Sequence, residues 1–344
     1  MQNHRQAMVE RLGLLERLIE TVVRDGESPT RVASSERPKE EVDVVISGGG
    51  LRGYFVTGAS AVFRERFEQA NIDIKRYAGT SAGAWCAAFI TMGMSTTHWC
   101  QTYTKTREYC MKYPEKKIHQ AYREVVIPWF YKEAIIPEDA YARCSRRCFI
   151  SITRLTPLPQ NEIVSEFKSN EDLLECLLAS SAIPYFTEPT LTGWFRGERA
   201  IDGGISNNLP LFLDNPNRYQ LILRLSDIPI TWTNLVSPGD DCIESMVLRG
   251  ALMFHRFWRS SDKRKKESHQ DDIGPFYWYK SGADKTESDD DNFNEDSGFM
   301  RSSVSISKLG LNHGVRVLLT TSWLVIFSFC TCVRRLLFMM KNTK

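Results

Sequence analysis

The stretch that decides the fold reads DVVISGGGLRGYFVTGAS and covers residues 43–60. Its apolar run Val44–Ile46 is typical of a buried strand, three consecutive glycines follow it, and the remainder is compatible with a helix. The spacing of Gly48, Gly50 and Gly53 also satisfies the dinucleotide-binding pattern G-x-G-x-x-G. Two ligand chemistries therefore remain open for this glycine loop: a pyrophosphate, or the oxyanion that develops when an ester is cut.

The rest of the chain favours one large α/β domain with appendages. Its 344 residues are 42% hydrophobic and 25% charged, the composition of an ordinary globular protein. Strand-like runs at 42–47, 148–153 and 220–225 alternate with helix-compatible segments, which predicts a sheet with helices on its faces in a domain spanning 42–258. The aromatic and proline-rich segment 111–143 is interpreted as an insertion, either a packed helical subdomain, which we favour, or a lid.

Both ends of the chain differ in composition from this domain. Residues 1–41 are predicted to form an amphipathic helix at 6–24, which packs on its own domain or lies on a membrane or partner, and then a polar linker. Residues 259–312 carry dense charge and are predicted to be a disordered tether. Residues 317–333 contain no charge, and a helix of that length spans about 26 Å, the short end of what a bilayer requires. We therefore predict a membrane segment within 313–344, with a buried or interfacial helix as the alternative.

Composition also limits the classes of partner and cofactor. A formal net charge of +2 gives no overall attraction to nucleic acid, so no nucleic-acid partner is expected. Nine cysteines are scattered without the spacing of a disulfide framework or a zinc site. We therefore expect no metal, no cofactor and a reducing compartment. Charges interrupt every apolar run near the N-terminus, so no secretory signal peptide is expected.

A second motif, GTSAG at residues 79–83, fits the nucleophile-elbow pattern G-x-S-x-G. It lies between a possible short strand and an alanine-rich helical segment, which is the context that such an elbow requires. Gly79 and Gly83 leave room for the sharp turn, and the N-terminus of the following helix favours negative charge beside Ser81. Ser81 is therefore the candidate nucleophile.

The elbow changes the interpretation of the glycine loop. A serine that transfers acyl groups needs backbone N–H donors aimed at the oxyanion, and a glycine run after a strand presents them without obstruction. Arg52 adds a positive charge suited to holding a phosphate or the loop itself. The nucleotide interpretation is disfavoured, because Asp73 precedes the second apolar run instead of closing it and no G-K-[ST] ending is present.

The third motif is Asp202–Gly204, with the sequence DGG. Asp202 follows a short apolar step, so a carboxylate is displayed at a strand end, and Gly203 and Gly204 form a tight turn after it. Without the other motifs, this Asp-Gly pair would be interpreted as an ordinary turn.

Taken together and in this order, the motifs SGGGLRG, GTSAG and DGG resemble those of the patatin-like phospholipase family, which includes the catalytic domain of cytosolic phospholipase A2. The segment LASSAIPYFTEP at 178–189 is similar to the one that precedes the aspartate in that family. The resemblance covers about 42–225 and implies a mostly parallel central sheet flanked by helices in a three-layer sandwich.

The resemblance also implies a catalytic dyad in which Ser81 is the nucleophile and Asp202 is the base. Arg52 would assist an oxyanion hole built from the amides of the glycine loop. The loop residues assigned to it are Gly48, Gly49, Gly50 and Gly53. A triad ending in histidine is the alternative.

The histidines that follow Asp202 argue against that triad. His255 flanks a basic stretch, and His269 and His313 lie in or beside the predicted tether, so none is well placed. Under the dyad, all six histidines are dispensable for turnover.

The expected function is a membrane-associated lipid acyl hydrolase, anchored through 317–333 with its catalytic domain in the cytosol. Its substrate would be a phospholipid or another acyl lipid at a bilayer. A triacylglycerol lipase and a lipid transacylase are alternatives on the same fold. A catalytically silent membrane scaffold that recruits partners through 259–312 is an alternative of another class.

Overall fold

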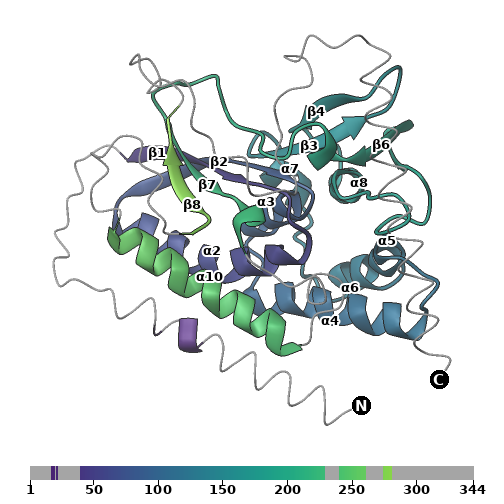
Figure 1. The fold of residues 1–344 in the computed structure, drawn as a ribbon, viewed down its shortest axis with the longest axis horizontal. Helices are drawn as coiled ribbons and strands as arrows, with labels where there is room; N and C mark the ends of the chain where they lie inside the picture. The colour runs from purple at the N-terminus through teal and green to yellow at the C-terminus, as the bar shows by residue number, and fades with distance from the viewer. Residues whose placement is uncertain (1–16, 20, 22–38, 229–239, 261–273, 281–344) are drawn as a thin grey trace, which may run out of the picture.

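The computed structural model describes residues 17–19, 21, 39–228, 240–260 and 274–280. One mixed sheet organises these residues (Figure 1). Its strands are β1 (Glu40–Ile46), β2 (Ile72–Thr80), β3 (Cys148–Arg154), β4 (Gln160–Val164), β5 (Gly193–Phe195), β6 (Glu198–Asp202), β7 (Tyr219–Leu223) and β8 (Phe276–Tyr279). The described α-helices are α2 (Gly53–Gln69), α3 (Ala82–Met92), α4 (Thr96–Lys112), α5 (Ile118–Ala121), α6 (Ile127–Lys132), α7 (Ala140–Cys144), α8 (Asn170–Ser180) and α10 (Asp240–Ser260).

The strands follow the order β5-β6-β3-β2-β1-β7-β8, with β4 also paired to β3. The central pairs β3/β2, β2/β1 and β1/β7 are parallel, whereas β4, β6 and β8 pair antiparallel with their neighbours. The carboxyl ends of β1, β2 and β3 therefore meet at one edge of the sheet. The prediction of an α/β sheet with helices packed on it is confirmed, and its three predicted strands correspond to β1, β3 and β7. The sheet is mixed, however, and not mostly parallel, because the strands outside the central four pair antiparallel.

The two faces of the sheet are covered differently. Val44 and Ile46 of β1 face the main core, which takes side chains from α2, α3, α4, α6, α7, α8 and α10. Val45 faces a smaller cluster with Phe212 and Ile222, to which the described helices contribute no residue. The three-layer prediction places a second layer of helices on this face. In the described ranges, an irregular segment around Phe212 covers the face instead.

Helices α2 and α10 run side by side beneath the sheet (Figure 1). Their backbones approach closely because each carries a glycine at the contact. A Cβ atom on Gly58 would overlap the Val247 carbonyl, and one on Gly250 would overlap the Phe55 carbonyl. The helix that ends the predicted 42–258 domain is thereby an integral part of the core.

The predicted insertion at 111–143 forms the short helices α5 to α7, with a π-helical turn at Tyr122–Val126 that joins α5 to α6. Val126, Phe130 and Ile136 of this segment are buried in the main core. The interpretation as a packed helical subdomain is therefore confirmed.

The regions predicted outside 42–258 are described only in part. Phe276–Tyr279, within the predicted tether, instead forms strand β8, whose aromatic side chains pack on the sheet edge beside β7. Of residues 1–38 only 17–19 and 21 are described, all helical, and strand β1 begins at Glu40, inside the predicted linker. The predicted membrane segment at 317–333 lies outside the described residues. Within the described ranges, no helix is long and apolar enough to cross a bilayer.

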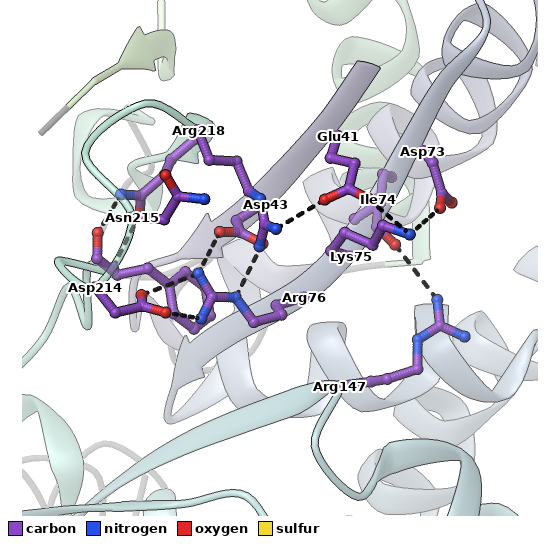
Figure 2. Close-up of polar contacts among 12 residues, drawn as sticks. Glu41, Asp43, Asp73, Ile74, Lys75, Arg76, Arg147, Asp214, Asn215 and Arg218 are labelled. Atoms are coloured by element: carbon purple, nitrogen blue, oxygen red, sulfur yellow. Dashed lines mark hydrogen bonds and ion pairs between the residues drawn. The ribbon is translucent and has the colours of Figure 1, made fainter. Parts of the chain in front are cut away.

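Toward the end of the sheet remote from the carboxyl ends of β1 and β2, Asp43, Arg76, Asp214 and Arg218 form the central part of a larger network of charged side chains (Figure 2). Glu41 connects Arg218 to the exposed pair of Lys75 and Asp73. Asp43 of β1 is 1% exposed and accepts from Arg76 Nη2 at 2.7 Å and from Arg218 Nη1 at 3.5 Å. Arg76 also pairs with Asp214 at 2.7 Å and lies over the ring of Phe212. This cluster fastens the segment after β6 to the middle of the sheet.

Replacing Asp43 with asparagine is expected to lower the free energy of unfolding by about 2–4 kcal/mol, because the partly buried guanidinium groups of Arg76 and Arg218 lose the negative charge of a fully buried carboxylate. Urea denaturation measures the change. Asp73→Asn is the matched control: this carboxylate pairs with Lys75 but is 41% exposed, so its loss should cost about 0–1 kcal/mol. Equal effects of the two variants would contradict the argument.

Candidate active site

Ser81 follows β2 directly and precedes α3, so the local strand–turn–helix order is that of a nucleophile elbow. Its backbone has φ 54° and ψ −125°, which places a non-glycine residue in a sparsely populated region. The Ser81 carbonyl accepts from the amides of Ala84 and Trp85 in the first turn of α3. The hydroxyl is thus held at the carboxyl edge of the sheet, on the axis of a helix N-terminus.

The two elbow glycines are required by close backbone approach. A Cβ atom on Gly79 would overlap the Gly83 carbonyl, and one on Gly83 would overlap the Ile46 carbonyl at the end of β1. The elbow can therefore pack against the start of the glycine loop only with glycine at both positions.

Ser180, the last residue of α8, supports the strained elbow. Its Oγ atom accepts from the Ser81 amide at 2.9 Å and donates to the Ser151 carbonyl at 2.7 Å. The side chain is fully buried. The sequence pattern of 178–189 indicates no role for Ser180, because only the folded structure brings it against a residue 99 positions away.

Asp202 ends β6, and its carboxylate lies beside Ser81. Its Oδ1 atom accepts from the Gly204 amide at 2.7 Å, and the carboxylate also accepts from the Ser81 hydroxyl. Burial raises the pKa of Asp202 to about 6, against the opposing effect of these two hydrogen bonds. A Cβ atom on Gly203 would overlap the Ser151 carbonyl, so the turn after the aspartate also depends on glycine.

The glycine loop approaches the same point from β1. A Cβ atom on Gly48 would lie 3.2 Å from Ser81 Cβ. The Gly48 amide, however, donates to Asn208 Oδ1 at 3.0 Å. Among the described residues, the amides of Gly49 and Gly50 have no hydrogen-bond acceptor. The amides of Gly49 and Gly50 are therefore available to an oxyanion in this conformation, whereas the Gly48 amide already has an acceptor.

Two other residues assigned to the oxyanion hole have structural partners. The Gly53 amide donates to the carbonyls of Gly50 and Leu51 at the start of α2. Arg52 Nε donates to the Ile228 carbonyl at 2.8 Å, which ties the loop to the segment after β7. Burial lowers the pKa of Arg52. The sequence leaves two roles open for Arg52, holding a phosphate or holding the loop. In the structure Arg52 holds the loop.

Neither Ser81 nor Asp202 has a histidine partner in the part of the chain that the structure describes. His255 lies beside Arg66, whereas His269 and His313 lie outside the described residues. His119 is buried, with Nδ1 2.7 Å from Glu188 and Nε2 3.2 Å from Ser181. It ties the helical insertion to the segment beside Ser180.

Across the described ranges, no three His, Cys, Asp or Glu side chains converge in a way that could hold a metal ion. The seven described cysteines form no disulfide with one another. The polar groups gathered around Ser81 are therefore a carboxylate, hydroxyls and backbone amides, a set suited to acyl transfer.

Comparison with known proteins identifies the same region. The family described as patatin-like phospholipase matches residues 44–213. The chain is 30% identical over 182 residues to the omega-hydroxyceramide transacylase of Mus musculus, covering 50% of this chain and 28% of that protein. It is 27% identical over 179 residues to human patatin-like phospholipase domain-containing protein 4, covering 50% of this chain and 68% of that protein.

A third relative is a 1-acylglycerol-3-phosphate O-acyltransferase of Mus musculus, 26% identical over 180 residues, covering 51% of this chain and 42% of that protein. The chain thus spans less than half the length of two of these three relatives. The glycine loop, the elbow and the aspartate turn all lie inside the matched region. Through residues 44–213, this chain belongs to the patatin-like phospholipase family.

Proposed function

We propose that this chain is a lipid acyl hydrolase that cleaves fatty-acyl esters of glycerolipids, with Ser81 as nucleophile and Asp202 as base. The observation that carries the proposal is the hydrogen bond from the Ser81 hydroxyl to a buried carboxylate whose pKa is raised to about 6. An ordinary carboxylate, with a pKa near 4, is a weak base for a serine hydroxyl. Burial brings Asp202 closer to the basicity that proton transfer at neutral pH requires.

The proposed reaction proceeds in two steps. Ser81 Oγ attacks the ester carbonyl while its proton moves to Asp202, and the carbonyl oxygen becomes an oxyanion facing the amides of Gly49 and Gly50. Collapse of the tetrahedral intermediate releases the alcohol, which takes the proton from Asp202, and leaves an acyl-enzyme. Water then attacks this ester with Asp202 again as base, the fatty acid leaves, and the proton returns to Ser81.

A lipid transacylase is the second candidate. It uses the same acyl-enzyme but passes the acyl group to a lipid hydroxyl instead of water. Two relatives favour it: one is named a transacylase and another an acyltransferase. A triacylglycerol lipase differs only in the lipid that acylates Ser81.

The deciding experiment supplies the full chain with phospholipid vesicles and with triacylglycerol emulsions, each with and without lipids bearing a free hydroxyl. Mass spectrometry of the products separates released fatty acid from acylated acceptor. We expect fatty acid from phospholipid, absent with Ser81→Ala. Acylated acceptor as the main product would favour the transacylase, and no Ser81-dependent product from any lipid would favour the scaffold.

The pH dependence of turnover follows from Asp202. A base must be unprotonated to act, so kcat/KM should rise with pH and level off above an inflection near pH 6. A stopped assay between pH 4.5 and 8.5 measures this profile. A soluble short-chain ester is used as the substrate, so that effects of pH on a lipid surface do not contribute to the result. An inflection near pH 4 would contradict the role of burial.

We also propose that the segment 317–333 anchors the chain in a membrane with the catalytic domain in the cytosol. The support is the uncharged run between arginines in the sequence. Fractionation of cells that express the full chain or residues 1–312 tests this. The full chain should resist alkaline extraction from membranes, and the shorter chain should not.

A further inference from the structure

Asn208 stands at the junction of the glycine loop and the aspartate turn. Its Oδ1 atom accepts from the Gly48 amide at 3.0 Å. A Cβ atom on Gly204 would lie 3.0 Å from Asp202 Oδ1 and 3.1 Å from Asn208 Oδ1. One side-chain amide therefore lies beside both the carboxylate of the dyad and the loop that faces the oxyanion.

The segment that carries Asn208 is fixed to the strand ends beneath it. The carbonyl of the preceding residue, Asn207, accepts from Thr80 Oγ1 and Ser151 Oγ, each at 2.9 Å. The hydroxyls of Ser206 and Thr153 lie 2.7 Å apart. Asn208 thus projects from a segment held to β2 and β3, the strands whose carboxyl ends surround Ser81.

Arg52 holds the far end of the glycine loop to the Ile228 carbonyl, whereas the glycines before it have no side chains to hold them. Gly48, Gly49 and Gly50 have no side chains, and Gly50 adopts φ 59°, in the left-handed region that favours glycine. Consecutive glycines have wide conformational freedom, whereas an oxyanion hole requires donors held in place before the reaction. The hydrogen bond to Asn208 fixes the first peptide plane of this run.

We propose that Asn208 is a positioning residue that orients the oxyanion loop by accepting the Gly48 amide. The inference rests on the proposed acyl-transfer function. It reassigns Gly48 from an oxyanion donor to an anchoring point and leaves the amides of Gly49 and Gly50 as the donors. Asn208 acts through this loop and forms no bond to the reacting atoms.

Three variants test the proposal. Asn208→Ala removes the acceptor and should lower kcat about 10–100-fold while changing KM less than about 2-fold, because misplaced donors affect the transition state and not lipid binding. Asn208→Asp keeps an acceptor for Gly48 and should recover most of the kcat at high pH. It also places a carboxylate beside Asp202, so the inflection near pH 6 should move upward.

Asn207→Ala is the matched control. Among the described residues, the Asn207 side chain hydrogen-bonds only to Asn161, at 3.3 Å, and the contacts of the Asn207 carbonyl survive the substitution. It should leave kcat, KM and the pH profile close to those of the parent chain.

Hydrogen exchange provides a readout that needs no turnover. In Asn208→Ala, amides in a peptide covering residues 44–55 should exchange faster than in the parent chain, whereas Asn208→Asp and Asn207→Ala should leave them unchanged. Unchanged exchange in Asn208→Ala overturns the proposal even if no ester is cleaved. Faster exchange in a chain without ester activity supports the positioning role while rejecting the proposed function. An increase in kcat in Asn208→Ala also overturns the proposal, since it would identify Gly48 as a donor.

Discussion

Ser81→Ala is expected to lower acyl-ester hydrolysis at least about 10³-fold, because the acyl-enzyme cannot form without the hydroxyl. Release of fatty acid from phospholipid vesicles by the purified full chain measures the loss. Ser226→Ala, at an exposed serine after β7 that hydrogen-bonds only to Asp227, is the matched control and should retain full activity. Activity that survives in Ser81→Ala would assign the chemistry to another residue.

Asp202→Asn tests the base and separates catalysis from folding. It should lower turnover about 10³-fold or more, because the amide cannot accept the Ser81 proton. The same variant should be more stable than the parent chain at pH 8. A carboxyl whose folded-state pKa is raised to about 6 destabilises the fold progressively as pH rises from about 4 to about 6.

The stability gain of Asp202→Asn should therefore be small near pH 4 and approach a limit of about 3 kcal/mol above pH 6. Urea denaturation at pH 4.5 and at pH 8 measures the difference. A variant that is inactive and also less stable at pH 8 would indicate a structural role for the carboxylate, in conflict with its assignment as a buried base.

Gly250→Ala is expected to destabilise the fold by about 2–4 kcal/mol, although alanine favours helices over glycine by about 1 kcal/mol. The added methyl group would overlap the Phe55 carbonyl of α2, and a backbone atom cannot rotate away. The two helices must then separate, which loosens contacts of buried residues along both.

Thermal or urea unfolding of Gly250→Ala measures this loss. Ser245→Ala, at an exposed position of the same helix, provides the control and should be neutral or slightly stabilising. A stabilised Gly250→Ala would show that helix propensity outweighs the contact between α2 and α10.

Local patterns in the sequence were sufficient to locate the elbow and the glycine loop. A strand that ends in a sharp glycine turn before a helix has a signature of a few residues, and the structure has this order at both Gly48–Gly50 and Gly79–Gly83. The residues that hold these turns had no such signature. Ser180 reaches Ser81 across 99 positions and Asn208 reaches Gly48 across 160, so only the tertiary fold reveals them.

Two features of the fold escaped prediction for different physical reasons. The four aromatic residues of β8, Phe276–Tyr279, have a strong strand propensity. They lie within the densely charged segment 259–312, however, and the average composition of that segment indicated disorder. No sequence pattern predicts that residues around Phe212 cover the second face of the sheet. Apolar residues in an irregular segment have no period, and the Arg76 cluster that fastens this segment forms only after the strands pair.

Strand β8 determines where the catalytic domain can be cut. It forms the outer neighbour of β7, pairing Gln220 with Tyr279 and Leu223 with Phe276. A fragment that ends at Ser260 would leave β7 with a row of unpaired amides and carbonyls beside apolar side chains, the kind of edge on which other chains add strands and aggregate. A soluble fragment of this protein therefore has to extend past Tyr279, well beyond residues 44–213, which match the family.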